Sequence, residues 1–273
     1  MRGGICYTLC VERSRNSETL ARQCTAVVFC GGRGTRLQKC LRGRVKALVP
    51  LARKPYLHGL FHQLLDAGIK EVLLCVSPST SDIIEDVRDG SNYGMTVRYS
   101  LDSGLNENAG ALWHCRRQIY TPLAVCINGD TIVDVDLHQL LRAHIRSGAV
   151  STLVASSRTD QPHPRAVEVD MSGTVVDIHE WAQDQKVTFQ VSPFSKFYSN
   201  SGIYVLDIQS LSHQWSDKER VGKLEQGLLR SLARRNALFA YQNGDRYLID
   251  LGTPERLSAA RAQINTISRF FTV

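Results

Sequence analysis

A glycine-rich segment with the sequence GGRGTRL occupies residues 31–37, directly after a short apolar run. Its three glycines within four positions allow a tight turn that brings consecutive backbone N–H groups close to an anion. A dinucleotide-binding fingerprint starting at Gly32 would need glycine or alanine at position 37, where Leu37 stands. The pattern GxxxxGK(S/T) of a P-loop is absent as well. We therefore expect a phosphate-binding loop of a different kind.

Two basic residues accompany this loop. Arg36 lies within it, and Lys46 follows downstream in the segment VKALVPLARKP. For the glycines alone, an ordinary strand-to-helix turn with solvated cations would be the simpler interpretation. Two cations beside a glycine cradle suit a triphosphate better than a dinucleotide, so we favour a triphosphate site.

Two carboxylates, Asp130 and Asp250, each follow an apolar strand-like run. Ligands of open α/β sheets bind beyond the carboxyl ends of strands, and two carboxylates there can hold Mg²⁺. Either residue alone could equally cap a helix or a turn. His58 and His62 could share a helix face and bind zinc, but no third ligand is suggested, so we expect ordinary histidines flanking a core helix.

From residue 25 onward, apolar runs typical of strands alternate with amphipathic stretches typical of helices. Expected strands cover residues 25–30, 71–76 and 123–128, and expected helices cover residues 54–68, 107–119 and 136–148. This alternation predicts an α/β fold, with a Rossmann-like, mostly parallel sheet flanked by helices on both faces.

The second half of the chain has a different texture. After residue 148, short alternating runs predict further strands, in the same sheet or in a lid, with a hairpin turn at 170–173. A final helix is expected to open at the segment GTPERLSAARAQINTI. We expect one domain over residues 25–273 and a leader over residues 1–24, either disordered or the product of an overlong start-site assignment.

Composition limits the class of protein. The chain has 273 residues, of which 43% are hydrophobic and 22% charged, as in an ordinary globular protein. The net charge of +7 could indicate nucleic-acid binding, but it is spread without blocks of like charge, and a protein that binds phosphorylated small molecules fits equally well. No apolar run has the length of roughly 18 residues that a membrane span needs. Eight cysteines without a CxxC pair indicate reduced thiols in a cytoplasmic protein.

Several motifs in order resemble the sugar-1-phosphate nucleotidylyltransferases. GGRGTRL and VKALVPLARKP match the family's GGxGTRL and PKxLxPxxxKP, and NAGAL, NGDT, NSGIYVL and YLIDLGTPERL follow. The resemblance spans residues 25 to 262. Within the family, the chain is most similar to heptose-1-phosphate and mannose-1-phosphate guanylyltransferases that lack a C-terminal β-helix. It implies a sheet of the nucleotide-diphospho-sugar transferase type.

The resemblance also implies a set of site residues. Those expected to bind the nucleotide are Gly31, Gly32, Arg33, Gly34, Thr35, Asn108, Ala109, Gly110 and Gly129. Those expected to take part in catalysis are Arg36, Lys46 and Asp130, with Asp130 and Asp250 as ligands of Mg²⁺. Those expected to contact the sugar are Glu180 and Asn200.

Two positions depart from the family pattern. Where the family has Glu-Lys, this chain has Glu180 followed by Trp181, so the cation expected on the sugar phosphate is missing. Lys186 or Lys196 could replace it, or the ring of Trp181 could stack on a sugar face. The second departure is at the start of NAGAL: Glu107 and Asn108 stand where the family has Gly-Thr, and Glu107 is either solvent-facing or alters base or ribose recognition.

The implied reaction joins a nucleoside triphosphate to a sugar 1-phosphate and releases pyrophosphate, without a protein nucleophile. Our best substrate assignment is GTP with D-glycero-D-manno-heptose 1-phosphate or mannose 1-phosphate. A regulatory homologue that binds sugar nucleotides without turnover is the alternative, and a molybdopterin or choline-phosphate nucleotidyltransferase is a less favoured one. We expect neither nucleic-acid nor membrane partners, and we leave a homodimer open.

Overall fold

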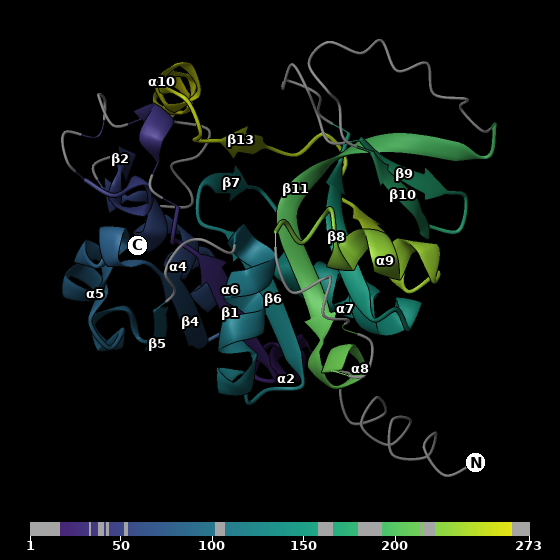
Figure 1. Ribbon diagram of the computed structural model, residues 1–273, viewed down its shortest axis with the longest axis horizontal. Helices are drawn as coiled ribbons and strands as arrows, with labels where there is room; N and C mark the ends of the chain where they lie inside the picture. The colour runs from purple at the N-terminus through teal and green to yellow at the C-terminus, as the bar shows by residue number, and fades with distance from the viewer. Residues whose placement is uncertain are drawn as a thin grey trace.

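The computed structural model describes residues 17–32, 34–37, 41, 44–51, 54–101, 107–157, 166–179, 193–212, 215 and 222–263. The parallel part of the sheet has the strand order β6-β1-β4-β5. These strands are β1 (Cys24–Phe29), β4 (Glu71–Val76), β5 (Thr96–Leu101) and β6 (Leu123–Asn128). The three strands expected in this half are confirmed, and β5 is an additional one (Figure 1).

Helices cover both faces of this sheet, as expected. Alternate side chains of a strand point to opposite faces, so Ala26 and Val28 of β1 belong to one apolar cluster and Val27 to the other. The first cluster contains the apolar faces of α4 (Tyr56–Asp66) and α7 (Leu137–Ser147). The second contains those of α6 (Glu107–Cys115) and α9 (Leu228–Arg234), which lie in front of the sheet in Figure 1.

The remaining helices of the described part are short or peripheral. They are α2 (Ser17–Ala21), α5 (Asp82–Val87), α8 (Ile208–Ser212) and α10 (Pro254–Ala262). Single 3₁₀ turns are η1 (Thr35–Leu37), η2 (Lys46–Leu48), η3 (Pro78–Thr80), η4 (Ser91–Tyr93) and η5 (Arg116–Gln118). The expected final helix is confirmed as α10, which Pro254 and the capping hydroxyl of Thr253 initiate. No helix among the described residues has the length and apolarity needed to cross a membrane.

Strands of the second half extend the same sheet rather than forming a separate lid. They are β8 (Ser151–Ser156), β9 (Ala166–Asp170), β10 (Val175–His179), β11 (Ser195–Asp207) and β12 (Leu238–Gln242). The long strand β11 pairs antiparallel with β6, β8 and β9, so that nine strands of the described chain form one sheet. The hairpin turn at 170–173 is confirmed between β9 and β10, and Gly173 adopts a φ of +90° there.

Two small ribbons lie beside the main sheet. One pairs β2 (Pro50–Leu51) with β3 (Lys54–Pro55), and the other pairs β7 (Thr131–Val133) with β13 (Leu248–Asp250). The second ribbon joins segments that are far apart in sequence, because β7 directly follows β6 while β13 precedes the last helix. It brings the two expected metal ligands, Asp130 and Asp250, to neighbouring positions.

The ordered domain begins before residue 25. Helix α2 packs into the first apolar cluster, where Leu20 is 3% exposed and Ala21 is fully buried. The other residues assigned to the leader, 1–16, lie outside the described residues. Helix α2 is therefore packed against the domain, although its residues were expected to belong to the leader.

Candidate active site

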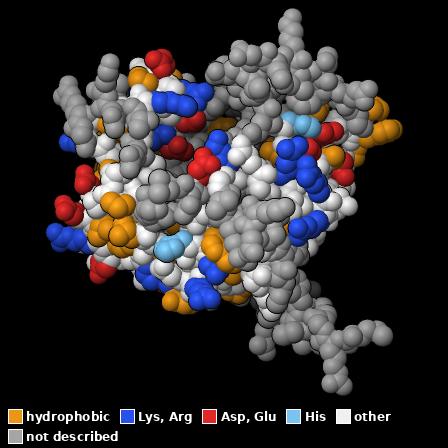
Figure 2. Space-filling view, in the orientation of Figure 1, with side chains coloured by type: hydrophobic (Ala, Val, Ile, Leu, Met, Phe, Trp, Pro, Cys, Tyr) orange, Lys and Arg blue, Asp and Glu red, His pale blue; other side chains and the backbone are white. Residues whose placement is uncertain are grey.

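A cavity of about 370 Å³ opens at the carboxyl ends of β1 and β6. It is lined by Phe29, Cys30, Gly31, Gly32, Lys46, Ala47, Cys75, Val76, Glu107, Asn108, Ala111, Asn128, Gly129, Asp130, Lys223 and Glu225. Figure 2 shows acidic and basic side chains next to each other near the middle of this face. The position agrees with the rule that open α/β sheets bind ligands beyond the carboxyl ends of their strands.

The glycine loop leaves β1 along one wall of this cavity. Cys30 N donates to Cys75 O at 2.8 Å, and Ser77 Oγ donates to Gly31 O at 3.0 Å. These bonds tie the start of the loop to the end of β4. Gly32 is exposed, and a Cβ added to it would meet nothing within 4 Å. Backbone and small groups therefore form this wall and leave room for a ligand.

At the end of β6, the backbone of Gly129 passes close to the backbone of Phe29 in β1. Its N–H donates to Phe29 O at 3.1 Å. A Cβ at this position would lie 2.6 Å from Phe29 O and 2.9 Å from Cys30 Sγ, closer than real side chains approach. Only glycine lets the segment after β6 pass this close to β1, which sets the position of Asp130.

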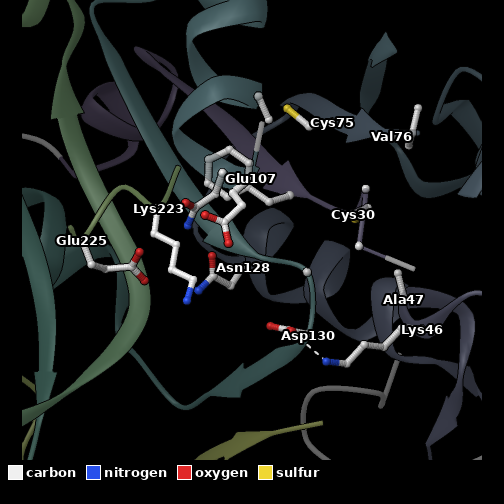
Figure 3. Close-up of a pocket in the computed structure, with 16 residues that line it drawn as sticks. Cys30, Lys46, Ala47, Cys75, Val76, Glu107, Asn128, Asp130, Lys223 and Glu225 are labelled. Atoms are coloured by element: carbon white, nitrogen blue, oxygen red, sulfur yellow. Dashed lines mark hydrogen bonds and ion pairs between the residues drawn. The ribbon is translucent and has the colours of Figure 1, made fainter. Parts of the chain in front are cut away.

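Lys46 and Asp130 meet across the cavity floor. Lys46 Nζ lies 2.7 Å from Asp130 Oδ2, and the two side chains are 13% and 42% exposed (Figure 3). Gly34, at a φ of +57°, packs against the stem of this lysine, with its virtual Cβ 3.4 Å from Lys46 Cβ. The loop that carries Gly34 thus also holds Lys46, the expected catalytic cation, toward the carboxylate.

Asp250 lies next to Asp130 through the β7–β13 ribbon. Asp250 is opposite Thr131 in the antiparallel pairing of β13 with β7, and Leu251 N donates to Asp130 O at 2.7 Å. Its carboxylate accepts from Gly252 N at 2.5 Å and from Arg256 Nη1 at 2.6 Å. Asp250 does not line the cavity itself.

The residues of the NAGAL motif begin a helix. Glu107, Asn108 and Ala109 form the start of α6, and Glu107 has the unusual φ of +49° for a residue with a side chain. Asn108 Oδ1 accepts from Leu224 N at 2.8 Å, while Ala109 N donates to Gly222 O at 3.0 Å. These two groups therefore dock the segment 222–225 against α6. Ala109 and Gly110 are buried, and neither is a lining residue.

Asn200 lies in an irregular part of β11, where the pairing with β8 shifts between Asn200 and Tyr204. Its Nδ2 donates to Tyr204 Oη at 2.9 Å, and that hydroxyl donates to Glu225 Oε1 at 3.0 Å. Glu225 lines the cavity and is only 2% exposed. Asn200 is thus linked to the cavity wall through two hydrogen bonds without lining the cavity itself.

Several expected residues lie elsewhere. Arg36, in η1, is exposed and does not line the cavity, and Lys196 is exposed on β11. Only the backbone of Thr35 is described. Other expectations fall on residues outside the described ranges: Arg33, Glu180, Trp181 and Lys186.

Among the lining residues with an amide or a charged side chain, three were not expected at the site from the sequence: Asn128, Lys223 and Glu225. Asn128 precedes the NGDT glycine, and a virtual Cβ on Gly202 would lie 2.6 Å from its Nδ2, so β11 needs glycine there to pass it. Lys223 and Glu225 lie in the turn before α9. Nothing in their local sequence separates them from other solvent-facing charges, because tertiary packing alone brings this turn to the cavity.

The histidines and cysteines have structural environments. His58 Nε2 lies 2.7 Å from Asp86 Oδ2, and His62 Nδ1 lies 3.2 Å from Asp66 Oδ2. No group of three metal-ligating side chains that could hold an ion occurs among the described residues. The described cysteines are buried thiols, and burial with the nearby Asp130 raises the pKa of Cys30 to about 12, which makes it a poor nucleophile.

The fold and the cavity together define an α/β protein with a cavity where β1 passes into its glycine loop. Comparison with known proteins identifies the family. The family model for nucleotidyl transferases matches residues 25–267. The chain therefore belongs to the nucleotidyl transferase family, whose members transfer nucleotidyl groups to sugar 1-phosphates and generally use a divalent metal ion.

Individual relatives agree with this family. D-glycero-alpha-D-manno-heptose 1-phosphate guanylyltransferase of Campylobacter jejuni is 30% identical over 84% of this chain and 95% of its own length. Mannose-1-phosphate guanylyltransferase of Mycobacterium tuberculosis is 27% identical over 85% of this chain and 62% of its own length. The crystal structure of HddC from Yersinia pseudotuberculosis superposes with a TM-score of 0.67 at 20% identity, covering 88% of this chain and 98% of that one. This likeness confirms the fold class.

Proposed function

We propose that this chain transfers a guanylyl group from GTP to a sugar 1-phosphate, either D-glycero-D-manno-heptose 1-phosphate or mannose 1-phosphate. One observation carries the proposal: residues from three distant segments, namely Gly31 and Gly32, Lys46, and Gly129 with Asp130, line one cavity. The sugars and the base are those named for the two enzymes compared above. The remaining support is the match of the family over nearly the whole chain.

The proposed reaction is an in-line exchange at phosphorus. A phosphate oxygen of the sugar 1-phosphate forms a bond to the α-phosphorus of the nucleotide, the bond from that phosphorus to the bridging oxygen breaks, and pyrophosphate leaves with the electron pair. Lys46 and the loop amides would hold the triphosphate and offset its developing charge. The chain supplies orientation and charge, because the attacking group belongs to the substrate.

We also propose Mg²⁺ as the metal ion, with Asp130 and Asp250 as its protein ligands. Magnesium is commonly held by one or two carboxylates plus substrate phosphates, and the β7–β13 ribbon brings the backbones of Asp130 and Asp250 close together, which supports this proposal. Among the described residues, the cavity lining carries two cations and three carboxylates, so it does not neutralise a triphosphate by itself. The ion would supply the missing positive charge. Lys46 and Arg256 orient the two carboxylates.

The test is pyrophosphate release measured over a matrix of five nucleoside triphosphates against hexose and heptose 1-phosphates. We expect the highest kcat/KM with GTP and one of the two named sugars. Asp130→Asn and Asp250→Asn should each raise the Mg²⁺ concentration needed for half-maximal rate, because the amide removes the ligand charge at nearly constant shape. Full activity in EDTA would contradict the metal assignment, and a higher kcat/KM with another base would contradict the choice of GTP.

A second candidate function is binding of sugar nucleotides without turnover. It is favoured by Glu107, a residue with a side chain at a φ of +49° where the family has glycine, and by Trp181 in place of the family lysine. Calorimetric binding of GDP-mannose without pyrophosphate release in any substrate pair would support this candidate and exclude the enzyme.

A further inference from the structure

Lys223 is a second cation in the cavity, on the wall opposite Lys46. Figure 3 shows its side chain entering from the side of β11 and ending near Asn128, while Lys46 reaches in from the other side toward Asp130. Lys46 already has a carboxylate partner at 2.7 Å. The side chain of Lys223 makes no hydrogen bond or ion pair with any of the described residues.

The backbone around Lys223 is firmly held. Ala109 N donates to Gly222 O at 3.0 Å, and Asn108 Oδ1 accepts from Leu224 N at 2.8 Å. On its other side, the carboxylate of Glu225 is buried against Tyr204 Oη. Residues on both sides of Lys223 are therefore anchored, and its ammonium group is directed at the cavity by a fixed segment. A preorganised cation facing a partly enclosed space is suited to an anionic ligand.

We propose that Lys223 binds the phosphate group of the sugar 1-phosphate. This inference rests on the proposed nucleotidyl transfer. Lys223 adjoins Glu225, which connects through Tyr204 to Asn200, the residue expected at the sugar. The glycine loop and Lys46, which would hold the triphosphate, lie on the opposite wall.

This assignment also accounts for the departure at position 181. The family lysine expected to neutralise the sugar phosphate is a tryptophan in this chain, and Lys196, which is described, does not line the cavity. Lys223 supplies the same charge from a different segment, the turn before α9. The two lysines then hold the two substrates on opposite walls, the triphosphate at Lys46 and the sugar 1-phosphate at Lys223. The reacting α-phosphate lies between them.

The test separates the two substrates. Lys223→Met keeps the length of the side chain without its charge, and Lys223→Arg keeps the charge. We expect Lys223→Met to raise KM for the sugar 1-phosphate roughly tenfold to a hundredfold, as for loss of one charged hydrogen bond, while KM for GTP changes less than about twofold. Lys223→Arg should recover part of the loss. Lys70→Met, an exposed lysine before β4, is the matched control and should leave both values unchanged.

The inference is overturned if Lys223→Met raises KM for GTP instead, if it changes neither KM, or if Lys186→Met or Lys196→Met produces the effect on the sugar substrate. Calorimetric titration of mannose 1-phosphate and heptose 1-phosphate into the wild type and Lys223→Met proteins gives a readout that needs no turnover. If the wild type releases no pyrophosphate, the proposed transfer fails, and a sugar-phosphate Kd that is still weakened in Lys223→Met would support the binding role alone. An unchanged Kd would overturn it.

Discussion

At the scale of single residues, the short Lys46–Asp130 pair is the feature with the clearest functional consequence. Lys46→Ala removes the cation that lines the cavity on the side of the glycine loop, and we expect kcat/KM to fall by the equivalent of about 2–4 kcal/mol in the transition state. Arg36→Ala tests whether the exposed arginine of η1, which does not line the cavity, also reaches the phosphates, and a loss of similar size would show that it does. The measurement is steady-state pyrophosphate release, with thermal unfolding to confirm that both variants fold.

Near-normal turnover in both variants would contradict the assignment of a triphosphate to this side of the cavity. Little stability should be lost with Lys46, because its partner Asp130 is 42% exposed and can be hydrated when the lysine is absent. A variant that is inactive and also unfolds at a much lower temperature would therefore not count as support.

Gly129 gives a second prediction at this scale. A Cβ 2.6 Å from Phe29 O forces β6 and β1 apart at the cavity edge, so Gly129→Ala should lower the free energy of unfolding by about 1–3 kcal/mol. Gly32→Ala is the matched control for stability, since its Cβ would meet nothing within 4 Å. Urea unfolding of the two variants checks the difference. If Gly129→Ala and Gly32→Ala are equally stable, a side chain at position 129 does not strain the close approach of β6 to β1, and the prediction is wrong.

At the scale of elements, α7 and β8 are joined by a buried histidine. His144 Nδ1 lies 2.9 Å from Thr152 Oγ1, and burial lowers the pKa of His144 to about 4. In the unfolded chain the imidazole has a pKa near its usual value of 6.5. The unfolded state therefore binds a proton first as the pH falls, and the stability contributed by the neutral imidazole is present above pH 6.5 and lost on the way down to pH 4.

The prediction is a pH-dependent stability that one substitution removes. Between pH 8 and pH 5 the wild-type protein should lose about 2 kcal/mol of unfolding free energy more than His144→Gln. Urea unfolding at the two pH values measures this difference. If both proteins have the same pH dependence, His144 takes up its proton in the folded state at an ordinary pKa and the buried contact with Thr152 is not maintained.

At the scale of the whole molecule, the cavity is assembled from segments that span most of the chain, from Phe29 to Glu225. A ligand that bridges them binds only the folded state and stabilises it by about 2.7 kcal/mol at a hundredfold excess over its Kd. We expect GTP with Mg²⁺ to raise the unfolding temperature by several degrees and to do so more than ATP or UTP at equal concentration. An equal shift with every nucleotide would contradict selection of the base by this cavity.

The sequence was sufficient for most of the parallel half of the fold, in which β5 was the strand not expected. The strands at β1, β4 and β6 and the helix α4 are marked by long apolar runs and helical spacing, which depend on local sequence. The glycine loop, Lys46 and Asp130 were found because their motifs are short and contiguous. The order of the antiparallel strands was not predictable, because β11 pairs with strands that lie far from it in sequence and shows no local sign of its partners.

Lys223 and Glu225 show the same limit at the site. Each is a charged residue in a turn, and its neighbours in sequence carry no motif that indicates a ligand. Their place in the cavity depends on the contacts of Asn108 and Ala109 with the segment 222–225, across more than a hundred residues of chain. Likewise, the exposed position of Arg36 and the burial of Ala109 and Gly110 follow from packing rather than from the motifs that contain them.

The long strand β11 has a consequence for biosynthesis. In the described sheet it joins β6, and with it the parallel strands, to β8 and β9 (Figure 1). Until residues 203–207 of β11 have been synthesised, the backbone of β6 is an open edge that can pair with another chain. Translation must therefore pass residue 207 before this edge is closed. A ribosomal stall within β11 would release a product prone to aggregation, although the glycine loop, Lys46 and Asp130 had all been synthesised.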